Sequence, residues 1–498
     1  MLRGAWRISR ARGNGVFLAE TIADTIYDVV IIGSGPAGYT AAIRAGQLGL
    51  KTALIEAASV LGGTCLHVGC IPTKALLFNA ELWDHLKHAS EYGIEGVDGR
   101  TLNWVNVQKR KESIVTKHTK GLEFLMKKNK VTVISGYGRL TGSAKDGVHA
   151  IELSKTGDGS KGETSQVKAK NVIVATGSDA KMMLGLKPDD RILTNIEMLA
   201  VNQVPKSLIV IGAGAVGVEF GSIFRSFGTE VTIVEFLPRM VPAEDEEISK
   251  ELARVFKKRG IDVNTGAKVE KIEKTETGVK VTWVGANGKT VEKEAEKVLV
   301  AVGRAPRTAD VGIEKTRIEM DRGFIKVNEA QQTAEPGVYA IGDIVAGFPQ
   351  LAHVGGMSGI VAVTNIAGRK FRAVRRDRIP ACTYTEPQIG SVGLTEAQAR
   401  EKGYTVKVGK FPFAGNSKAT IVGSHDGFVK IVADAKYGEI LGVHIIGPQA
   451  TELIAEAVAV MELEGTVDEL MFTIHAHPTI AEAMLDAYAA VEGMAINA

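Results

Sequence analysis

The sequence predicts an α/β fold in which two related βαβ units precede a C-terminal domain of mixed strands and helices. A strand, glycine loop, helix, strand pattern occurs twice, at residues 27–56 and 207–235, and it does not recur after about residue 375. The chain has 498 residues, enough for two to four domains with full cores. Its 56 glycines suit tight backbone loops better than an all-helical fold.

The first unit, from Tyr27 to Glu56, has the order of a Rossmann-like dinucleotide-binding domain. An apolar strand leads directly into Gly33, Gly35 and Gly38, a helical pattern follows, and the strand T-A-L-I-E ends at Glu56. In this motif the first glycine makes the turn, the second admits the pyrophosphate at the helix N-terminus, and the third lets helix pack on strand. We expect Glu56 to accept the ribose hydroxyls.

The second unit repeats the first. The run S-L-I-V-I-G-A-G-A-V-G contains Gly212, Gly214 and Gly217, and Glu235 lies 23 positions after Gly212, the same spacing as in the first unit. Two homologous nucleotide domains are the simplest interpretation. One real site with a decayed structural copy is the alternative, and it is disfavoured because both copies keep all three glycines and the acid.

Further patterns predict how the chain is divided. The runs N-V-I-V-A-T-G-S and K-V-L-V-A-V-G-R, at 171–178 and 297–304, are apolar strands that end in glycine, and we interpret them as crossings between domains. Alternation with turn signals predicts an antiparallel meander over 262–297. The predicted segments are an N-terminal extension (1–24), the first dinucleotide domain (25–177), the second (178–302), a return to the first (303–374) and an α+β domain (375–498).

Composition excludes several classes of protein. The net charge of +3 is too small to indicate nucleic acid or an anionic membrane as a partner, and no stretch is apolar enough to span a bilayer. Three cysteines cannot form a disulfide framework, which indicates a reducing compartment such as the bacterial cytoplasm. Residues 1–19 carry four arginines and no acid, a pattern typical of a mitochondrial presequence; a disordered extension or a misassigned start is the preferred interpretation.

Two of the three cysteines, Cys65 and Cys70, lie in G-G-T-C-L-H-V-G-C-I-P-T-K, just after Glu56. A close pair in a reducing compartment indicates catalysis or metal binding. Zinc is disfavoured because the neighbouring residues supply only His67 as a further ligand, so we expect no metal. The isolated Cys382 is expected to be a buried structural residue.

From residue 25 onward the chain resembles the pyridine nucleotide–disulfide oxidoreductases, a resemblance carried by G-S-G-P-A-G, the cysteine motif, Y-A-I-G-D (339–343) and H-A-H-P-T-I-A-E (475–482). It implies FAD in the first unit, NAD in the second and a dimerisation domain at the C-terminus. The implied FAD-binding residues are Gly33, Gly35, Pro36, Ala37, Gly38, Glu56, Gly63, Thr64, Lys74, Thr176, Gly177, Gly342 and Asp343. The implied NAD-binding residues are Gly212, Gly214, Gly217, Glu235 and Gly303.

The resemblance also assigns chemistry to the cysteine motif. Cys65 would be the exposed interchange thiol and Cys70 the thiolate beside the flavin, near a helix N-terminus that favours the charged form. Lys74 would add positive charge near the flavin and pair with Glu219.

In H-A-H-P-T-I-A-E, His477 matches the family's general base and Glu482 the carboxylate that orients it, while His475 has a supporting role. The family's histidine reaches the disulfide of the partner subunit, which implies a homodimer.

The implied activity is oxidation of protein-bound dihydrolipoyl groups to lipoyl disulfide with NAD, since Glu235 would repel the phosphate of NADP. The implied partners are lipoyl-bearing carrier domains and the core of 2-oxo acid dehydrogenase or glycine cleavage complexes. Alternatives are a glutathione-reductase-like enzyme and a non-catalytic docking or regulatory flavoprotein subunit. The chain departs from the family at His67 and in V-G-G-M-S-G (354–359), where an acid is common and Ser358 occurs.

Overall fold

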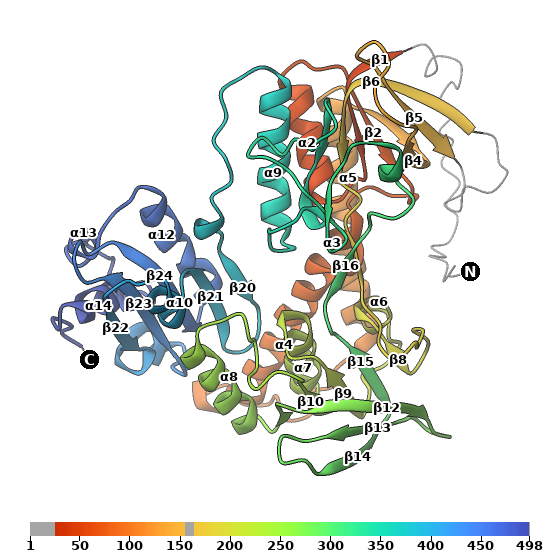
Figure 1. Cartoon of the computed structure of the whole chain (residues 1–498). Helices are drawn as coiled ribbons and strands as arrows, with labels where there is room; N and C mark the ends of the chain where they lie inside the picture. Colours follow the sequence, from red (N-terminus) through yellow and green to blue (C-terminus); the bar gives the residue numbers. More distant parts are fainter. Residues whose placement is uncertain (1–24, 155–163, 498) are drawn as a thin grey trace.

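The computed structural model describes residues 25–154 and 164–497, and the predicted extension over residues 1–24 lies outside them. A mixed sheet, a parallel sheet and an antiparallel sheet form the centres of three lobes (Figure 1). Within the described ranges no helix is both long and apolar enough to cross a bilayer.

The first sheet has the strand order β3-β2-β1-β6-β5-β4, and β19 joins the far side of β6. β1, β2, β3, β6 and β19 pair in parallel, whereas β4 and β5 extend the sheet antiparallel. The strands are β1 (Ile26–Ile32), β2 (Thr52–Glu56), β3 (Thr132–Ser135), β4 (Tyr137–Leu140), β5 (His149–Ser154), β6 (Thr164–Val174) and β19 (Val338–Ala340).

Two helices lie side by side against this sheet, α2 (Pro36–Gln47) and α9 (Ala352–Ile366) (Figure 1). A Cβ on Gly359 would lie 2.8 Å from the Ala37 carbonyl oxygen, and one on Gly355 would lie 3.0 Å from the Ala37 Cβ. The glycines of V-G-G-M-S-G therefore allow close packing of the two helices, and Ser358 is buried beside them.

The second sheet is fully parallel in the order β11-β10-β9-β15-β8, and α7 (Ala215–Ser226) and α8 (Glu246–Lys258) follow its strands. Its strands are β8 (Ile192–Leu193), β9 (Ser207–Ile211), β10 (Glu230–Val234), β11 (Asp262–Asn264) and β15 (Lys297–Val300).

The predicted meander is present but shorter than 262–297. It comprises β12 (Lys268–Lys274), β13 (Val279–Val284) and β14 (Thr290–Ala295). Both ends of the predicted range were wrong, because β11 pairs in parallel with β10 and β15 in parallel with β9. These short strands complete the buried sheet, and sequence alternation does not distinguish that pairing from an antiparallel one.

The two segments interpreted as domain crossings, 171–178 and 297–304, begin in β6 and β15 of different sheets, and only their last residues come together. β7 (Ser178–Ala180) pairs antiparallel with β16 (Arg304–Pro306), so the outgoing and returning chains form a two-stranded ribbon. After this ribbon the chain re-enters the first sheet through β19.

The C-terminal lobe is a five-stranded antiparallel sheet in the order β20-β21-β24-β23-β22, with helices against it (Figure 1). Its strands are β20 (Ala381–Thr383), β21 (Gln388–Gly393), β22 (Val406–Pro412), β23 (Phe428–Asp434) and β24 (Ile440–Gly447). Its helices are α10 (Glu396–Glu401), α11 (Ser417–Ile421), α12 (Ala450–Glu462), α13 (Val467–Leu470) and α14 (Glu482–Val491).

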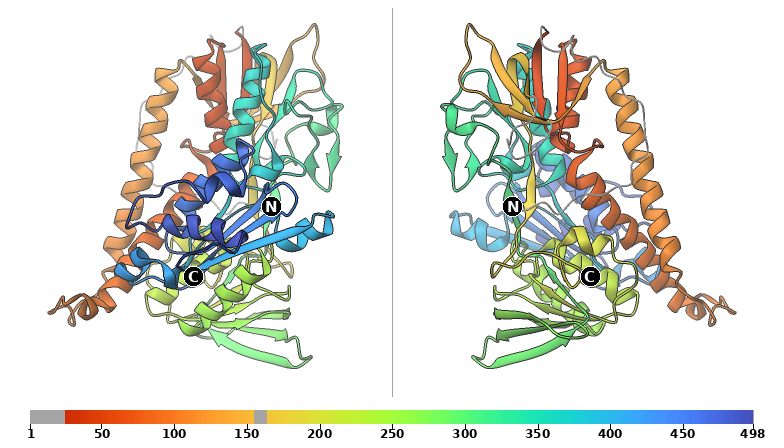
Figure 2. Two further views of the ribbon diagram at one scale, coloured as in Figure 1. Left: turned by 90° about the vertical axis from the view of Figure 1, so that its left-hand side faces the viewer. Right: turned by 90° about the vertical axis from the view of Figure 1, so that its right-hand side faces the viewer.

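Two long helices, α4 (Cys70–Lys87) and α5 (Trp104–Lys128), run along one side of the molecule (Figure 2). α4 packs against both α5 and α7, and the indole of Trp104 lies 6.1 Å from the ring of Phe224. The core that they share with the second sheet includes Leu76 and Phe220. The first residues of α4 are thereby held at the junction of the two nucleotide units.

Shorter elements complete the described part of the chain. They are α3 (Gly63–Val68), α6 (Asn195–Leu199), β17 (Met320–Asp321), β18 (Phe324–Ile325) and the 3₁₀ helices η1 (Ala89–Tyr92), η2 (Ile313–Lys315), η3 (Gly342–Ile344), η4 (Arg376–Arg378) and η5 (Phe413–Gly415).

Candidate functional site

The glycine loop after β1 has two packed glycines and one that faces open space. A Cβ on Gly33 would lie 2.4 Å from the Ala175 carbonyl oxygen, and one on Gly38 would lie 1.8 Å from that of Gly33. Gly35 has an ordinary φ of −64°, and nothing lies within 4 Å of where its Cβ would be. The chain's own packing therefore does not require a glycine at 35, which fits close approach by a ligand.

The loop after β9 has the same division of roles. A Cβ on Gly212 would lie 2.5 Å from the Ala301 carbonyl oxygen, and one on Gly217 would lie 1.9 Å from that of Gly212. Gly214 has a φ of −73° and open space before it. The two loops are therefore equivalent in backbone geometry as well as in sequence.

The glutamate at the end of the second strand of each βαβ unit accepts hydrogen bonds from the backbone of the glycine loop and of the next turn. The carboxylate of Glu56 accepts hydrogen bonds from Ser34 N at 2.9 Å and from Ala58 N at 2.7 Å. That of Glu235, which is buried, accepts from Ala213 N at 2.6 Å and from Leu237 N at 2.7 Å. Each carboxylate keeps lone pairs for further donors, as ribose recognition requires.

Further predicted residues surround the first loop. Gly63 packs on Gly35, since a Cβ on Gly63 would lie 2.7 Å from the Gly35 Cα, and α2 begins at Pro36. Gly342 packs similarly against Ala37, which brings η3 and its Asp343 to the start of α2. Thr64 lies in α3, and Thr176, Gly177 and Gly303 lie at the strand ends before the β7–β16 ribbon; Gly177 and Gly303 have φ values of 75° and 108°.

The cysteine pair lies where two helices meet. Cys65 is inside α3, and Cys70 is the first residue of α4, with Gly69 as the residue that caps both. A Cβ on Gly69 would lie 2.9 Å from the Thr64 carbonyl oxygen, so this tight junction requires glycine. Both cysteines are free thiols and are joined by a side-chain hydrogen bond.

The two thiols differ in exposure, but in the opposite sense to the one expected. Cys70 is exposed in the single chain and Cys65 is half-buried, so the expectation that Cys65 is the more exposed thiol was wrong for this chain. Protein atoms nevertheless surround both sulfurs closely enough to desolvate their thiolates.

The two thiols also differ in the pKa at which they lose their protons. The hydrogen bond with Cys65 lowers the pKa of Cys70 to about 7, with burial opposing it and the positive charge of Lys74 adding to it. The same hydrogen bond, together with burial, raises the pKa of Cys65. Cys70 is therefore the thiol that ionises first, at a helix N-terminus.

Lys74 and Glu219 form the ion pair that the resemblance implies. The Lys74 Nζ lies 2.8 Å from both carboxylate oxygens of Glu219, which is only 5% exposed. Lys74 lies one turn after Cys70 on α4, and Glu219 comes from α7 in the second nucleotide unit. The pair therefore joins the cysteine helix to the other nucleotide unit.

His477 and Glu482 also meet, in the C-terminal lobe. The His477 Nδ1 lies 2.9 Å from Glu482 Oε1, and Glu482 Oε2 accepts from Thr479 N at 2.8 Å. His475 instead contacts Glu456, a hydrogen bond that raises the pKa of His475. Among described residues His477 makes no contact with the cysteine pair, and its side chain is 73% exposed.

His67, where the chain departs from the family, is anchored to the loop before α3. Its Nε2 lies 2.8 Å from the Leu61 carbonyl oxygen. Cys382 is half-buried in β20, and burial raises its pKa to about 11.

Three residues near the cysteines were not predicted as site residues from the sequence. Tyr39 follows the first fingerprint, and the charges of both cysteines act on its hydroxyl. Arg304 donates from Nε to Ser178 Oγ at 2.7 Å, and Ser178 Oγ in turn donates to Asp343. Tyr384 reaches Lys74 and Glu219 from the C-terminal lobe. Tyr39 could have been found from its adjacency to G-S-G-P-A-G, whereas no local pattern marks the other two.

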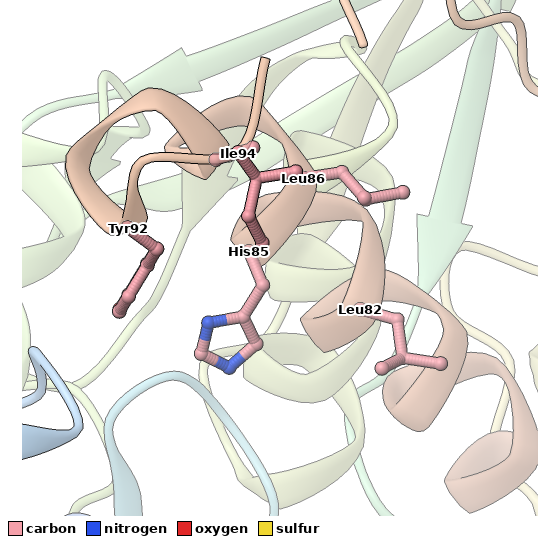
Figure 3. Close-up of a pocket in the computed structure, with 6 residues that line it drawn as sticks. Leu82, His85, Leu86, Tyr92 and Ile94 are labelled. Carbon is pink, nitrogen blue, oxygen red and sulfur yellow. The ribbon is translucent and has the colours of Figure 1, made fainter. Parts of the chain in front are cut away.

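A separate apolar hollow lies at the far end of α4 and in η1 (Figure 3). Its lining residues are Leu82, His85, Leu86, Ala89, Tyr92 and Ile94. It contains none of the predicted site residues.

Comparison with known proteins agrees with this architecture. Residues 27–359 match the family described as pyridine nucleotide-disulphide oxidoreductase, and residues 379–488 match the dimerisation domain of that family. The chain is also similar to solved structures of LpdA from Mycobacterium tuberculosis (TM-score 0.84, 28% identity, covering 92% of this chain and 98% of that one) and of the flavoprotein disulfide reductase RclA from Escherichia coli (TM-score 0.82, 25% identity, 93% and 99%).

Curated relatives align over nearly the whole chain. A dihydrolipoyl dehydrogenase from Bacillus subtilis is 45% identical over 480 residues, covering 95% of this chain and 99% of its own length. One from Mycobacterium leprae is 43% identical over 477 residues (95% and 100%), and a mitochondrial one from Pisum sativum is 42% identical over 464 residues (92% and 90%). The chain belongs to the pyridine nucleotide-disulphide oxidoreductase family.

Proposed function

We propose that this protein is a dihydrolipoyl dehydrogenase, which oxidises protein-bound dihydrolipoyl groups to lipoyl disulfide with NAD as the acceptor. The observation that carries the proposal is the cysteine pair itself: two free thiols at the junction of α3 and α4, with Cys70 at the N-terminus of α4 and an open glycine loop beside them. The similarity to curated dihydrolipoyl dehydrogenases over 95% of the chain supports the substrate class.

The cofactors are FAD and NAD. The first loop suits FAD because Gly35 leaves room for a pyrophosphate, and Gly63, Thr64 and Asp343 lie on the segments packed around it. The second loop suits NAD because Gly214 leaves the same room and the buried carboxylate of Glu235 would repel a 2′-phosphate. Bound FAD supplies the two-electron relay between the cysteine pair and NAD.

The chain's own residues perform the thiol chemistry. In the oxidised enzyme Cys65 and Cys70 form a disulfide, and His477 accepts a proton from one thiol of the dihydrolipoyl group. The resulting thiolate attacks Cys65, breaks the disulfide and releases Cys70 as a thiolate. The second dihydrolipoyl thiol then attacks the substrate sulfur of the mixed disulfide and breaks its bond to Cys65, which yields lipoyl disulfide. The proton of this second thiol passes to the departing Cys65 sulfur. One dithiol is thus oxidised for each cysteine pair reduced.

The base of each site comes from the partner subunit. His477 lies on the C-terminal lobe, which matches the family's dimerisation domain, and in the single chain it makes no contact with the described cysteines. A homodimer would bring His477 of the partner subunit to the thiol substrate, with Glu482 holding the imidazole through Nδ1 and leaving Nε2 free to accept the proton.

The physiological partners would be lipoyl-bearing carrier domains and the core of a 2-oxo acid dehydrogenase or glycine cleavage complex. This follows from the substrate, since a dihydrolipoyl group is carried on a protein arm. We assign the chain to the bacterial cytoplasm, or to the mitochondrial matrix if residues 1–24 are a presequence. N-terminal sequencing of the protein from its source would distinguish the two, because removal of the first residues would indicate import.

The activity is tested by steady-state kinetics with free dihydrolipoamide on the purified FAD-loaded protein, with NAD and NADP in parallel. We expect fast NADH formation with NAD and little turnover with NADP. If dihydrolipoamide gave no turnover while NADH still bleached the flavin, the substrate would be wrong and glutathione disulfide would be the next acceptor to test. Equal rates with NAD and NADP would contradict the role of Glu235.

The shared site is tested by subunit complementation. Cys65→Ser and His477→Ala subunits carrying different tags are co-expressed, and the heterodimer is purified through both tags. If the base comes from the partner, one of its two sites has both an intact cysteine pair and an intact histidine, so we expect about half the activity of the wild-type dimer. Both mutant homodimers should lose on the order of 100-fold or more. An inactive heterodimer would place the whole site in one chain.

A further inference from the structure

One residue from each lobe meets beside the cysteine helix. Lys74 comes from α4, Glu219 from α7, and Tyr384 from the segment that follows β20. The Tyr384 backbone N–H donates to Glu219 Oε1 at 3.0 Å, and the Lys74 Nζ lies 4.4 Å from the centroid of the Tyr384 ring. Tyr384 thus contacts both members of the ion pair, one through its backbone and one through its ring.

These contacts constrain the ammonium of Lys74. Glu219 is buried and binds the ammonium with both oxygens, and the aromatic face attracts the same cation. The Lys74 side chain is 31% exposed, so without the ring it could turn towards solvent.

We propose that Tyr384 is a positioning residue for the thiol chemistry, which holds the Lys74 ammonium against Glu219 and close to Cys70. The proposal depends on the proposed function in one respect, which is that Cys70 is the cysteine that becomes a thiolate. Removal of the ring would let Lys74 move away and leave the Glu219 carboxylate, which disfavours the thiolate, less well neutralised.

Several other charged or titratable groups interact electrostatically with Cys70, and none of them is mutated in the experiment below. They are Cys65 on α3, Tyr39 on α2, and Arg304 on β16, besides Lys74 and Glu219 themselves. Burial raises the pKa of Tyr384 to about 12, so its phenol is neutral between pH 5 and 9 and cannot itself produce a pH effect there.

The test is the pH dependence of Cys70 alkylation by iodoacetamide in the reduced, FAD-loaded dimer, with the modified peptide quantified by mass spectrometry. Tyr384→Leu removes the ring and keeps the backbone N–H. We expect its alkylation midpoint to rise by at least half a pH unit, which is roughly a threefold loss of thiolate well below the midpoint. Tyr384→Phe keeps the ring and should coincide with wild type.

Tyr437→Leu is the matched control, because Tyr437 is an exposed tyrosine of the same lobe whose ring also faces a lysine, Lys436 at 4.6 Å. It should not move the midpoint. If Tyr384→Leu fails to bind FAD or to form dimers, Tyr384→Met, whose side chain is longer and more flexible, takes its place. A midpoint equal to wild type in the ring-free variant, or an equal shift in Tyr384→Phe, would overturn the proposal. Alkylation requires no dihydrolipoamide, so this result is independent of the substrate test.

Discussion

Cys65 and Cys70 belong to adjacent helices, but only Cys70 begins one. The hydrogen bond from Cys65 and the nearby Lys74 favour its thiolate against the cost of burial, and the pKa of Cys70 falls to about 7. A group with that pKa is about half ionised at neutral pH, where thiolate supply and leaving-group ability are both useful. Cys382 provides an internal contrast, since burial raises its pKa to about 11.

This difference predicts how the reduced protein reacts with iodoacetamide between pH 5 and 9. Because the thiolate is the reactive form, Cys70 alkylation should rise about tenfold per pH unit below pH 7 and level off above it. Cys382 should react slowly and still be accelerating at pH 9. Peptide mapping by mass spectrometry gives both rates from one sample, and a Cys70 rate that keeps rising past pH 8.5 would contradict the lowered pKa.

At the scale of elements, each βαβ unit uses its glycines for different purposes. In the first loop Gly33 and Gly38 are required by contacts within the fold, with Ala175 and with Gly33 respectively, whereas a Cβ on Gly35 would meet no protein atom. Within one motif, the outer two glycines are therefore needed for packing and the middle glycine is free for ligand approach. The same holds for both loops.

Alanine substitutions in the second loop should separate these effects. Gly214→Ala should fold normally, keep FAD and raise the KM for NAD by about tenfold or more, because its Cβ would project only into the ligand space. Gly217→Ala should destabilise the protein by about 3 kcal/mol or more, because its Cβ would overlap the Gly212 carbonyl oxygen. Thermal unfolding and NAD kinetics measure the two, and a similar loss of stability in both variants would contradict the distinction.

At the scale of the whole molecule, a buried ion cluster joins the second nucleotide unit to the C-terminal lobe. Lys430 on β23 is 2% exposed, and its Nζ lies 3.0 Å from Asp245 Oδ1, 2.8 Å from Glu247 Oε1 and 2.9 Å from Glu396 Oε2. Asp245 also caps α8 by accepting from the Glu247 N–H. One lysine therefore fixes the N-terminus of a helix in one lobe to a strand of another.

Lys430→Met should lower the free energy of unfolding by about 3–5 kcal/mol, because it leaves the buried Asp245 carboxylate without its cation. Lys410→Met is the matched control: Lys410 pairs with Glu247 at the surface and should cost less than about 1 kcal/mol. Urea unfolding measures both, and equal effects would show that burial of the cluster contributes nothing.

The same cluster predicts an acid dependence. Burial alone would raise the pKa of Asp245, but the effects of His444 and Lys430 are larger, so this pKa lies below its ordinary value. The hydrogen bond from Lys430 also lowers the pKa of Glu396. A carboxylate with a depressed folded-state pKa stabilises the protein above its unfolded pKa and loses that contribution as pH falls. The stability difference between wild type and Lys430→Met should therefore shrink below about pH 4. A constant difference down to pH 2 would contradict this.

Local sequence patterns were sufficient for the nucleotide loops and the cysteine helix. The turn at Gly33, the start of α2 at Pro36 and the position of Cys70 at the first turn of α4 all depend on residues within a few positions of one another. The pairing of His477 with Glu482, five positions away, is also local. Such features follow from backbone geometry and short-range hydrogen bonds, which a sequence motif encodes directly.

Contacts across the lobes required the tertiary structure. Glu219 lies 145 positions from Lys74 and 165 from Tyr384, and Lys430 lies 185 from Asp245. The family resemblance supplied the first of these pairs, and no local pattern supplied the other two. The exposure of Cys70, the parallel pairing of β11 and β15, and the β7–β16 ribbon were likewise decided by packing, because burial and strand partners depend on which distant segments fill the neighbouring space.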